Sequence, residues 1–248
     1  MQKFKLLGVN VHSISPEEAY DYVLNSSQLD KTSHIVFLDT YLLIKSQFNK
    51  ELFNFINNAS LVIPISPGIK IGLKFLNRKL EKVYNYFNFI INLLIKYTDK
   101  KEFIYILGGN RSIIEKAERN IRDSYPGIRL VGRFHIDYKK DFEKDLITAI
   151  QKASPALILV GKKSPSQEKW IYKKEHYFKK GVFLGVKDFF EIVGGKKKSP
   201  TDEMVQSGFY RLFNLFKNPF RLFRIFYYII YIFLLLLSKI SRSHYYYN

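Results

Sequence analysis

The fold class is decided by the stretch ALILVGKKSPSQEKW (residues 156–170), which joins two kinds of local pattern. Its first five residues are all apolar, as in a strand that is covered on both faces of a sheet. A short turn with glycine and serine follows, and Ser166 opens a helical segment with the acid Glu168 in its first turn. A strand that passes through a tight turn into a helix is half of a βαβ unit, which indicates a parallel sheet.

The same pattern recurs along the chain. Further apolar runs lie at 34–38, 60–64, 103–107 and 182–186, with a weaker one at 129–132. Three segments between the runs are expected to be helices: one that opens at Ser15-Pro16, one over 112–124, and one over 166–180 with Trp170 and Tyr177 on its apolar face. Strands separated by helices predict an α/β fold, a Rossmann-like and mainly parallel sheet with helices on both faces.

Composition narrows the class of protein. The 248 residues are 47% hydrophobic and 25% charged, which is typical of a globular protein and excludes a disordered or fibrous one. The absence of cysteine excludes a disulfide scaffold, a thiolate metal site and a cysteine nucleophile. A net charge of +18 favours polyanionic partners, such as anionic lipid, phosphorylated substrates or nucleic acid. For the scattered lysines, a general bias toward Phe, Tyr, Ile, Asn and Lys is an equal explanation.

The residues that follow the predicted strands are the first candidates for a site, because ligands of parallel sheets bind beyond the carboxyl ends of the strands. Small or polar residues stand there, at 39–40, 65–68, 108–110, 161–165 and 187–188. Glycine lets a ligand approach the backbone and helix N-termini attract anions, so this edge suits phosphate or sugar binding. Each of these turns is equally explained as an ordinary connection between a strand and a helix.

The last 43 residues (206–248) differ in character from the body over 1–205. Residues 209–224 are basic and aromatic, and 225–237 form an apolar run that is shorter than the roughly 18 to 20 residues of a spanning helix. We therefore expect a C-terminal appendage, an amphipathic and apolar helix that lies in the membrane interface. A re-entrant segment, a buried core helix and a contact in a homo-oligomer are the alternatives. No recognition motif supports a nucleic acid as partner.

Four segments in order resemble the WecG/TagA/CpsF glycosyltransferase family of bacteria. Residues 161–170, GKKSPSQEKW, resemble the family's signature Gly-x-x-Ser-Pro-x-Gln-Glu-x-Trp. Residues 107–132 resemble its central Leu-Gly-Gly block, 189–200 resemble its Phe-Asp-x-x-x-Gly…Arg-Ala-Pro block, and 208–222 resemble its basic C-terminal appendage. The resemblance extends over nearly the whole chain.

This resemblance implies an inverting, metal-independent glycosyltransferase without a cofactor. Such an enzyme moves an N-acetylhexosamine-type sugar from a UDP-sugar to a lipid-diphosphate-linked acceptor in cell-surface polysaccharide biosynthesis, as a peripheral protein at the cytoplasmic face of the membrane. The residues assigned to substrate binding are Thr40, Ser66, Gly68, Lys82, Gly108, Gly109, Ser164, Gln167, Glu168 and Glu191. The residues assigned to contact with the membrane or the acceptor are Arg211, Lys217, Arg221 and Arg224.

The N-terminal catalytic motifs depart from the family pattern. Where the family has the Asp-Gly that supplies the proposed base, this chain has Ile65-Ser66, and where it has Thr-x-Asn, this chain has residues 37–39, Phe-Leu-Asp. Ile65 accepts no proton, so Asp39 is the candidate substitute base; alternatively it caps a helix that begins near Thr40. The chain is then either an active transferase with a different base or an inactive relative, a membrane-bound partner or scaffold for an active transferase.

Overall fold

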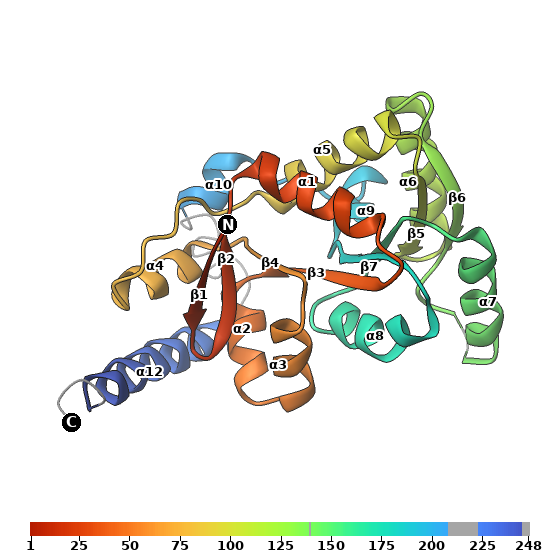
Figure 1. Cartoon of the computed structure of the whole chain (residues 1–248). Coiled ribbons are helices and arrows are strands. Elements are labelled where there is room, and N and C mark those ends of the chain that lie inside the picture. Colours follow the sequence, from red (N-terminus) through yellow and green to blue (C-terminus); the bar gives the residue numbers. More distant parts are fainter. Residues whose placement is uncertain (139, 208–222, 245–248) are drawn as a thin grey trace.

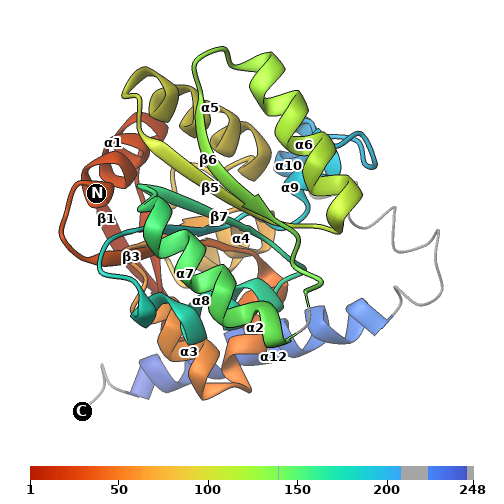
Figure 2. The same cartoon turned by 90° about the vertical axis from the view of Figure 1, so that its right-hand side faces the viewer.

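The computed structural model describes residues 1–138, 140–207 and 223–244. In this part of the chain six parallel strands form the central sheet, in the order β4-β3-β8-β7-β5-β6 (Figure 1, Figure 2). The strands are β3 (Thr32–Leu38), β4 (Leu61–Pro64), β5 (Phe103–Gly108), β6 (Arg129–Phe134), β7 (Leu157–Gly161) and β8 (Gly181–Gly185). Each predicted apolar run forms one of these strands, so the prediction of a parallel α/β sheet is confirmed.

Helices cover both faces of the sheet. Successive residues of a strand point to opposite faces, so an apolar run makes both faces apolar. In β3, Ile35 and Phe37 belong to one buried layer, and Val36 and Leu38 belong to the other. The first layer is covered by α1 (Pro16–Ser27), α5 (Tyr86–Asp99), α6 (Arg111–Ser124) and α9 (Phe189–Val193) (Figure 1). The second is covered by α2 (Thr40–Gln47), α3 (Lys50–Asn57), α7 (Glu143–Ala153) and α8 (Ser166–Lys174). This confirms the predicted arrangement of helices.

The helix expected over 166–180 is shorter than predicted. It ends at Lys174, and a 3₁₀ turn, η2 (Glu175–Tyr177), follows. The Glu175 carboxylate pairs with Nδ1 of the buried His34 at 2.8 Å, and Phe178 turns into the core, so the chain leaves the helix at this point. Tyr177 is therefore 48% exposed, and its predicted place on an apolar helix face was wrong.

An N-terminal hairpin was not predicted. Strands β1 (Gln2–Leu6) and β2 (Val9–Ser13) pair in antiparallel fashion, and Leu7 and Gly8 between them both adopt positive φ. The hairpin is joined to β4 by His12, whose Nδ1 accepts a hydrogen bond from the Val62 N–H at 2.9 Å. This hydrogen bond needs an imidazole ring that is not protonated at Nδ1.

The buried His12 makes the stability of the protein depend on pH. Burial lowers the pKa of His12 from 6.5 to about 4, and the nearby Lys3 acts in the same direction. As the pH falls, His12 of the unfolded chain is protonated at a higher pH than His12 of the folded protein. The contribution of neutral His12 to the free energy of unfolding is therefore complete above about pH 6.5, and it is lost between pH 6.5 and 4. We expect protonation of His12 to lower the free energy of unfolding by about 3 kcal/mol over this pH range, as measured by urea denaturation.

The matched variant for this prediction is His12→Asn, whose amide oxygen can accept the same N–H but does not titrate. Its free energy of unfolding should vary less between pH 7 and pH 4.5 than that of the wild type. An equal pH dependence in both proteins would place the titrating group elsewhere.

The remaining helices lie at one end of the molecule. They are α4 (Pro67–Phe75), α10 (Asp202–Ser207) and the C-terminal α12 (Phe223–His244). Elsewhere, a 3₁₀ turn, η1 (Lys140–Phe142), precedes α7. Helix α12 lies against α2 (Figure 1) and buries Tyr231 and Leu235. The Tyr231 hydroxyl donates to the Gly68 carbonyl oxygen at 2.8 Å, and it lies so close to Gly72 in α4 that a Cβ there would be 1.9 Å away.

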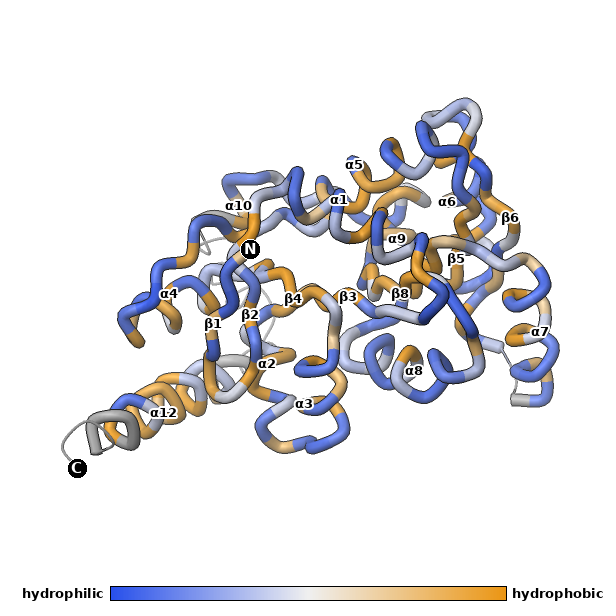
Figure 3. Tube along the Cα trace, viewed as in Figure 1, coloured by the Kyte–Doolittle hydropathy of each residue, from blue (hydrophilic) through white to orange (hydrophobic). Residues whose placement is uncertain are grey.

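The opposite side of α12 is apolar and exposed. Phe226, Ile229, Phe233, Leu236 and Ile240 are each 46% to 61% exposed, and at 100° per residue they lie opposite Tyr231 and Leu235. Figure 3 shows the apolar character of this helix. We call these five residues the α12 stripe. Among the residues that the structure describes, no helix has the length and apolarity needed to cross a membrane.

Candidate functional site

Polar residues at the carboxyl ends of neighbouring strands form one continuous chain of contacts. After β4, the Ser66 Oγ accepts the Thr40 N–H at 3.0 Å and lies 2.9 Å from the Thr40 Oγ1. Asp39, which precedes Thr40 at the end of β3, forms an ion pair between its Oδ2 and the Lys187 Nζ at 2.5 Å. Lys187 follows β8, so these contacts connect the ends of three adjacent strands.

Two residues of the signature segment extend this chain to β7. The Gln167 Oε1 accepts the backbone N–H of Lys187 at 2.8 Å, and its Nε2 donates to the Glu168 Oε1 at 2.9 Å. The Ser164 hydroxyl donates to the same Glu168 oxygen at 3.1 Å. We call the contacts from Ser66 to Ser164 the polar chain. The structure therefore brings together six residues that the sequence nominated at separate positions.

Asp39 holds the helix that follows it. Its Oδ1 accepts the Leu42 N–H at 2.8 Å as the N-cap of α2, which confirms the capping interpretation. Its other oxygen faces Lys187, and the two side chains are 16% and 14% exposed. The carboxylate is thus fixed in direction and mostly buried. Its role as a base stays a prediction.

Glu168 is the buried acid of the polar chain. It is 3% exposed, and its Oε2 has no hydrogen-bond partner among the described residues. Burial raises the pKa of Glu168, while the Gln167 amide and the Lys187 charge act in the opposite direction. Because its Oε1 accepts from Gln167, Glu168 determines which end of that amide points toward Lys187.

The glycines that end β5 and β7 pack against an aromatic ring. A Cβ on Gly108 or on Gly161 would lie 2.4 Å from the Phe190 Cδ2, so this ring occupies the space over both. Gly109 adopts a φ of +57°, which favours glycine, and a Cβ there would meet Ile113 at 2.9 Å. The open backbone expected for a ligand at Gly108 is thus filled by Phe190. Substrate binding by Gly108 and Gly109 stays a prediction.

The other nominated residues differ in how they relate to the polar chain. Lys82 is exposed in the connection between α4 and α5, and Glu191 lies on α9 with its Oε2 3.9 Å from the Lys197 Nζ. Gly68 follows Ser66 and packs on Thr40, since a Cβ there would lie 2.2 Å from the Thr40 Oγ1. Arg211, Lys217, Arg221 and the side chain of Arg224 lie outside the described residues.

Ile65, at the position of the family's proposed base, is turned into the core. It is 1% exposed and belongs to the buried layer that contains Phe37 and Phe89. Its backbone N–H donates to the Leu38 carbonyl oxygen at 3.0 Å, as in a continuing parallel pair. Ile65 and Gln167 nevertheless belong to the same edge of the sheet, because the polar chain begins at the next residue, Ser66.

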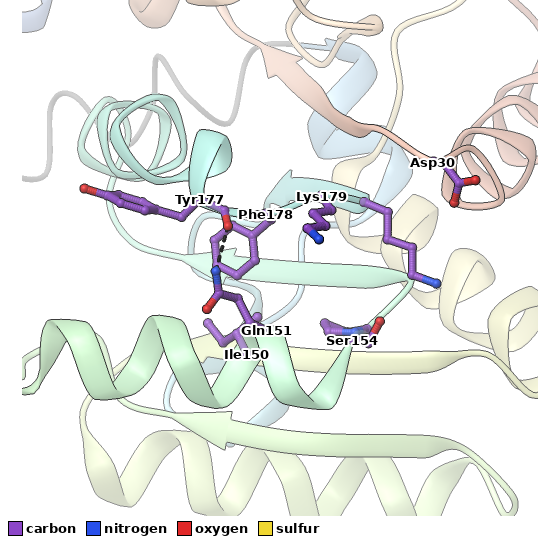
Figure 4. Close-up of a pocket in the computed structure, with 9 residues that line it drawn as sticks. Asp30, Ile150, Gln151, Ser154, Tyr177, Phe178 and Lys179 are labelled. Atoms are coloured by element: carbon purple, nitrogen blue, oxygen red, sulfur yellow. Dashed lines mark hydrogen bonds between the residues drawn. The ribbon is translucent and has the colours of Figure 1, made fainter.

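A cavity of about 750 Å³ lies at the opposite edge of the sheet (Figure 4). Its lining residues precede the strands β3, β7 and β8: Asp30, Ile150, Gln151, Ser154, Pro155, Tyr177, Phe178, Lys179 and Lys180. Parallel strands carry ligand sites at their carboxyl ends. The polar chain, rather than this cavity, is therefore the candidate site.

Two residues near the candidate site were given no role from the sequence, although 187–188 was expected at this edge. Lys187 stands directly after an apolar run, so its place at the edge could be inferred, but its pairing with Asp39 could not. Tyr231 is one aromatic residue within a long apolar run, and no local pattern distinguishes it. Both residues reach the site across large sequence separations, 148 residues for Lys187 and Asp39 and 163 for Tyr231 and Gly68.

Known proteins resemble this chain over much of its length. The chain is similar to the N-acetylglucosaminyldiphosphoundecaprenol N-acetyl-beta-D-mannosaminyltransferases of Bacillus subtilis (23% identical, covering 70% of this chain and 67% of the relative) and of Bacillus spizizenii (23%, covering 67% and 64%). It is also similar to the protein of that name from Staphylococcus aureus (30%, covering 38% and 37%). The sequence profile of the glycosyl transferase WecG/TagA/CpsF family matches residues 4–245. The chain therefore belongs to the WecG/TagA/CpsF family of glycosyl transferases.

Proposed function

We propose that this protein transfers an N-acetylhexosamine-type sugar from a UDP-sugar to a lipid-diphosphate-linked acceptor at the cytoplasmic face of the membrane, for a cell-surface polysaccharide. The polar chain is the observation that carries the proposal, because it combines an acid and a base, 16% and 14% exposed, with hydroxyl and amide groups at the ligand-binding edge of the sheet. The names of the relatives add support: they describe the transfer of N-acetylmannosamine to N-acetylglucosaminyldiphosphoundecaprenol.

The proposed reaction needs one proton acceptor and a place for a leaving diphosphate. A hydroxyl of the acceptor attacks the anomeric carbon of the donor, the bond from that carbon to the phosphate oxygen breaks, and UDP leaves with the electron pair. Asp39 takes the proton of the attacking hydroxyl. Helices α2, α4 and α8 begin at this edge, and their N-termini favour the negative charge of the leaving group.

The C-terminal helix supports a membrane location for this chemistry. The α12 stripe presents exposed apolar side chains, and an amphipathic helix of this kind lies in the interface of a bilayer. On its other side α12 reaches the site, because Tyr231 binds the carbonyl oxygen of Gly68, two residues after Ser66. A lipid-linked acceptor and a soluble donor would meet between these two surfaces.

The proposal is tested with purified protein, a UDP-sugar and the lipid-diphosphate acceptor in vesicles. We expect UDP to appear in proportion to the acceptor, measured by a coupled UDP assay, and to remain at background when the acceptor is omitted. Release of UDP at the same rate without the acceptor would contradict transfer. Failure of the wild type to bind any UDP-sugar would contradict the donor site.

The alternative is an inactive family member that acts as a membrane-bound partner or scaffold for an active glycosyltransferase. It is favoured by one observation: the position of the family's proposed base holds the buried Ile65. This alternative predicts that UDP binds without turnover, and that adding the protein raises the vesicle-bound fraction or the rate of an active transferase. Turnover by the purified chain alone would exclude it.

A further inference from the structure

We propose that the exposed side of α4, with the residues directly after it, binds the headgroups of anionic phospholipids beside the α12 stripe. Two neighbouring elements rather than one then contact the membrane. This inference rests on the proposed function, because it adds a second contact with the same membrane. We call this surface the α4 face, and it consists of four cations and one apolar side chain: Lys70, Ile71, Lys74, Arg78 and Lys79.

The cations of the α4 face are available to bind anions. All four are exposed, and none of them forms an ion pair with another residue that the structure describes. The sequence from 52 to 80 contains no Asp or Glu. The acids at the border of this surface are Glu81 and, on the adjacent α10, Asp202 and Glu203. The four positive charges are therefore held together at the surface without a partner of their own.

The exposed Ile71 distinguishes a lipid surface from other polyanions. It is 63% exposed and stands next to Lys70, one turn before Phe75 on the same side of α4. In the interface of a bilayer, a large apolar side chain enters the headgroup region, while the long side chains of Lys and Arg reach the phosphates. A nucleic acid would bind the cations and leave Ile71 in water. The composition of the α4 face therefore favours anionic lipid.

The α4 face lies next to the α12 stripe. The Tyr231 hydroxyl donates to the Gly68 carbonyl oxygen at 2.8 Å and packs on Gly72. Further along α12, the Lys239 Nζ lies 4.4 Å from the centre of the Phe75 ring. The two helices thus run side by side in the same direction for about two turns (Figure 1). A membrane that covers the α12 stripe lies beside the α4 face.

The two surfaces differ in how they depend on the charge of the lipid. The α12 stripe is apolar, so it partitions into neutral and anionic bilayers alike. The α4 face gains binding from anionic headgroups, and each basic side chain close to such a surface contributes about fivefold. Four of them contribute on the order of several hundred-fold, and this part of the binding decreases as salt is added.

The test is the partition of the purified full chain onto vesicles in which phosphatidylglycerol replaces phosphatidylcholine stepwise. The test variant replaces the four cations of the α4 face by glutamine: Lys70→Gln, Lys74→Gln, Arg78→Gln and Lys79→Gln. We expect it to bind phosphatidylglycerol vesicles on the order of several hundred-fold more weakly than the wild type. Its binding to pure phosphatidylcholine vesicles should equal that of the wild type, because the α12 stripe is unchanged. Sedimentation measures both quantities.

The matched control removes the same charge from exposed positions on α6 and α7, which lie at the other end of the molecule (Figure 1). It carries Lys116→Gln, Arg119→Gln, Lys144→Gln and Lys152→Gln, and we expect it to bind phosphatidylglycerol vesicles as the wild type does. An equal loss of binding in both variants would mean that net charge alone attracts the protein, which overturns the inference. Binding of the test variant at the wild-type level would overturn it as well.

A fluorescent label gives a second measurement that does not depend on the folding of a fourfold variant. The chain has no cysteine, so Ile71→Cys introduces a unique thiol for an environment-sensitive dye such as NBD. Addition of phosphatidylglycerol vesicles should shift the emission of this label to shorter wavelength and raise its intensity. A label at Lys116→Cys should keep the emission it has in water. If the label at position 71 also keeps it while the protein is bound to vesicles, the α4 face does not touch the lipid.

These measurements fail independently of the proposed function. If the wild type releases no UDP but the α4 variant and the label behave as expected, the transfer reaction is wrong and the α4 face stands. If the wild type releases UDP and the α4 variant binds vesicles as the wild type does, the transfer reaction stands and the α4 face is overturned.

Discussion

Asp39→Asn is expected to lower the acceptor-dependent rate of UDP release by about 100- to 10,000-fold, the usual contribution of a positioned general base. The amide cannot take up the proton of the acceptor hydroxyl at neutral pH. It can still accept the Leu42 N–H, so α2 keeps its cap and the fold should be unchanged. The measurement is the steady-state rate of UDP formation at saturating donor and acceptor, beside the thermal unfolding curve.

The matched control is Asp123→Asn, which removes the same charge from an exposed position in the last turn of α6. Its rate should equal that of the wild type. If Asp39→Asn retains turnover within tenfold of the wild type, another group accepts the proton.

Replacing Ile229, Phe233, Leu236 and Ile240 by serine is expected to release the protein from anionic vesicles. Burial of one large apolar side chain is worth about 1.5–3 kcal/mol, so four of them change the partition coefficient by about 10,000-fold or more. None of the four belongs to the buried contact of α12 with the body, which is made by Tyr231 and its neighbours. Sedimentation with phosphatidylglycerol vesicles measures the effect.

The control for this prediction carries the same kind of change elsewhere on the surface. Phe103 and Phe142 are 41% and 52% exposed at the start of β5 and before α7. Their replacement by serine should leave vesicle binding unchanged. If the stripe variant sediments with vesicles as the wild type does, then α12 is not the membrane contact, and an oligomer contact becomes the explanation of its exposed apolar side.

The sheet and the three helices expected at Ser15-Pro16, 112–124 and 166–180 could be predicted because their signals are local. A run such as 156–160 is apolar at every position, and in this chain such runs became strands covered on both faces. The end of α8 could not be predicted, because it depends on His34, which is far away in the sequence and binds Glu175. The hairpin of β1 and β2 likewise could not be predicted, because it is positioned by the hydrogen bond between His12 and Val62 of β4 and not by a local sequence pattern.

For the candidate site, the sequence by itself determined which residues stand after the strands and which family motif surrounds Gln167. The tertiary structure alone decided which of these residues touch. Parallel strands place residues far apart in the chain side by side, so the pairing of Asp39 with Lys187 follows from the strand order β3-β8. Burial decided the rest: it turned Ile65 into the core and left the Asp39 side chain 16% exposed at the edge. A periodic pattern shows how apolar each position is, but it does not show which neighbour a residue meets.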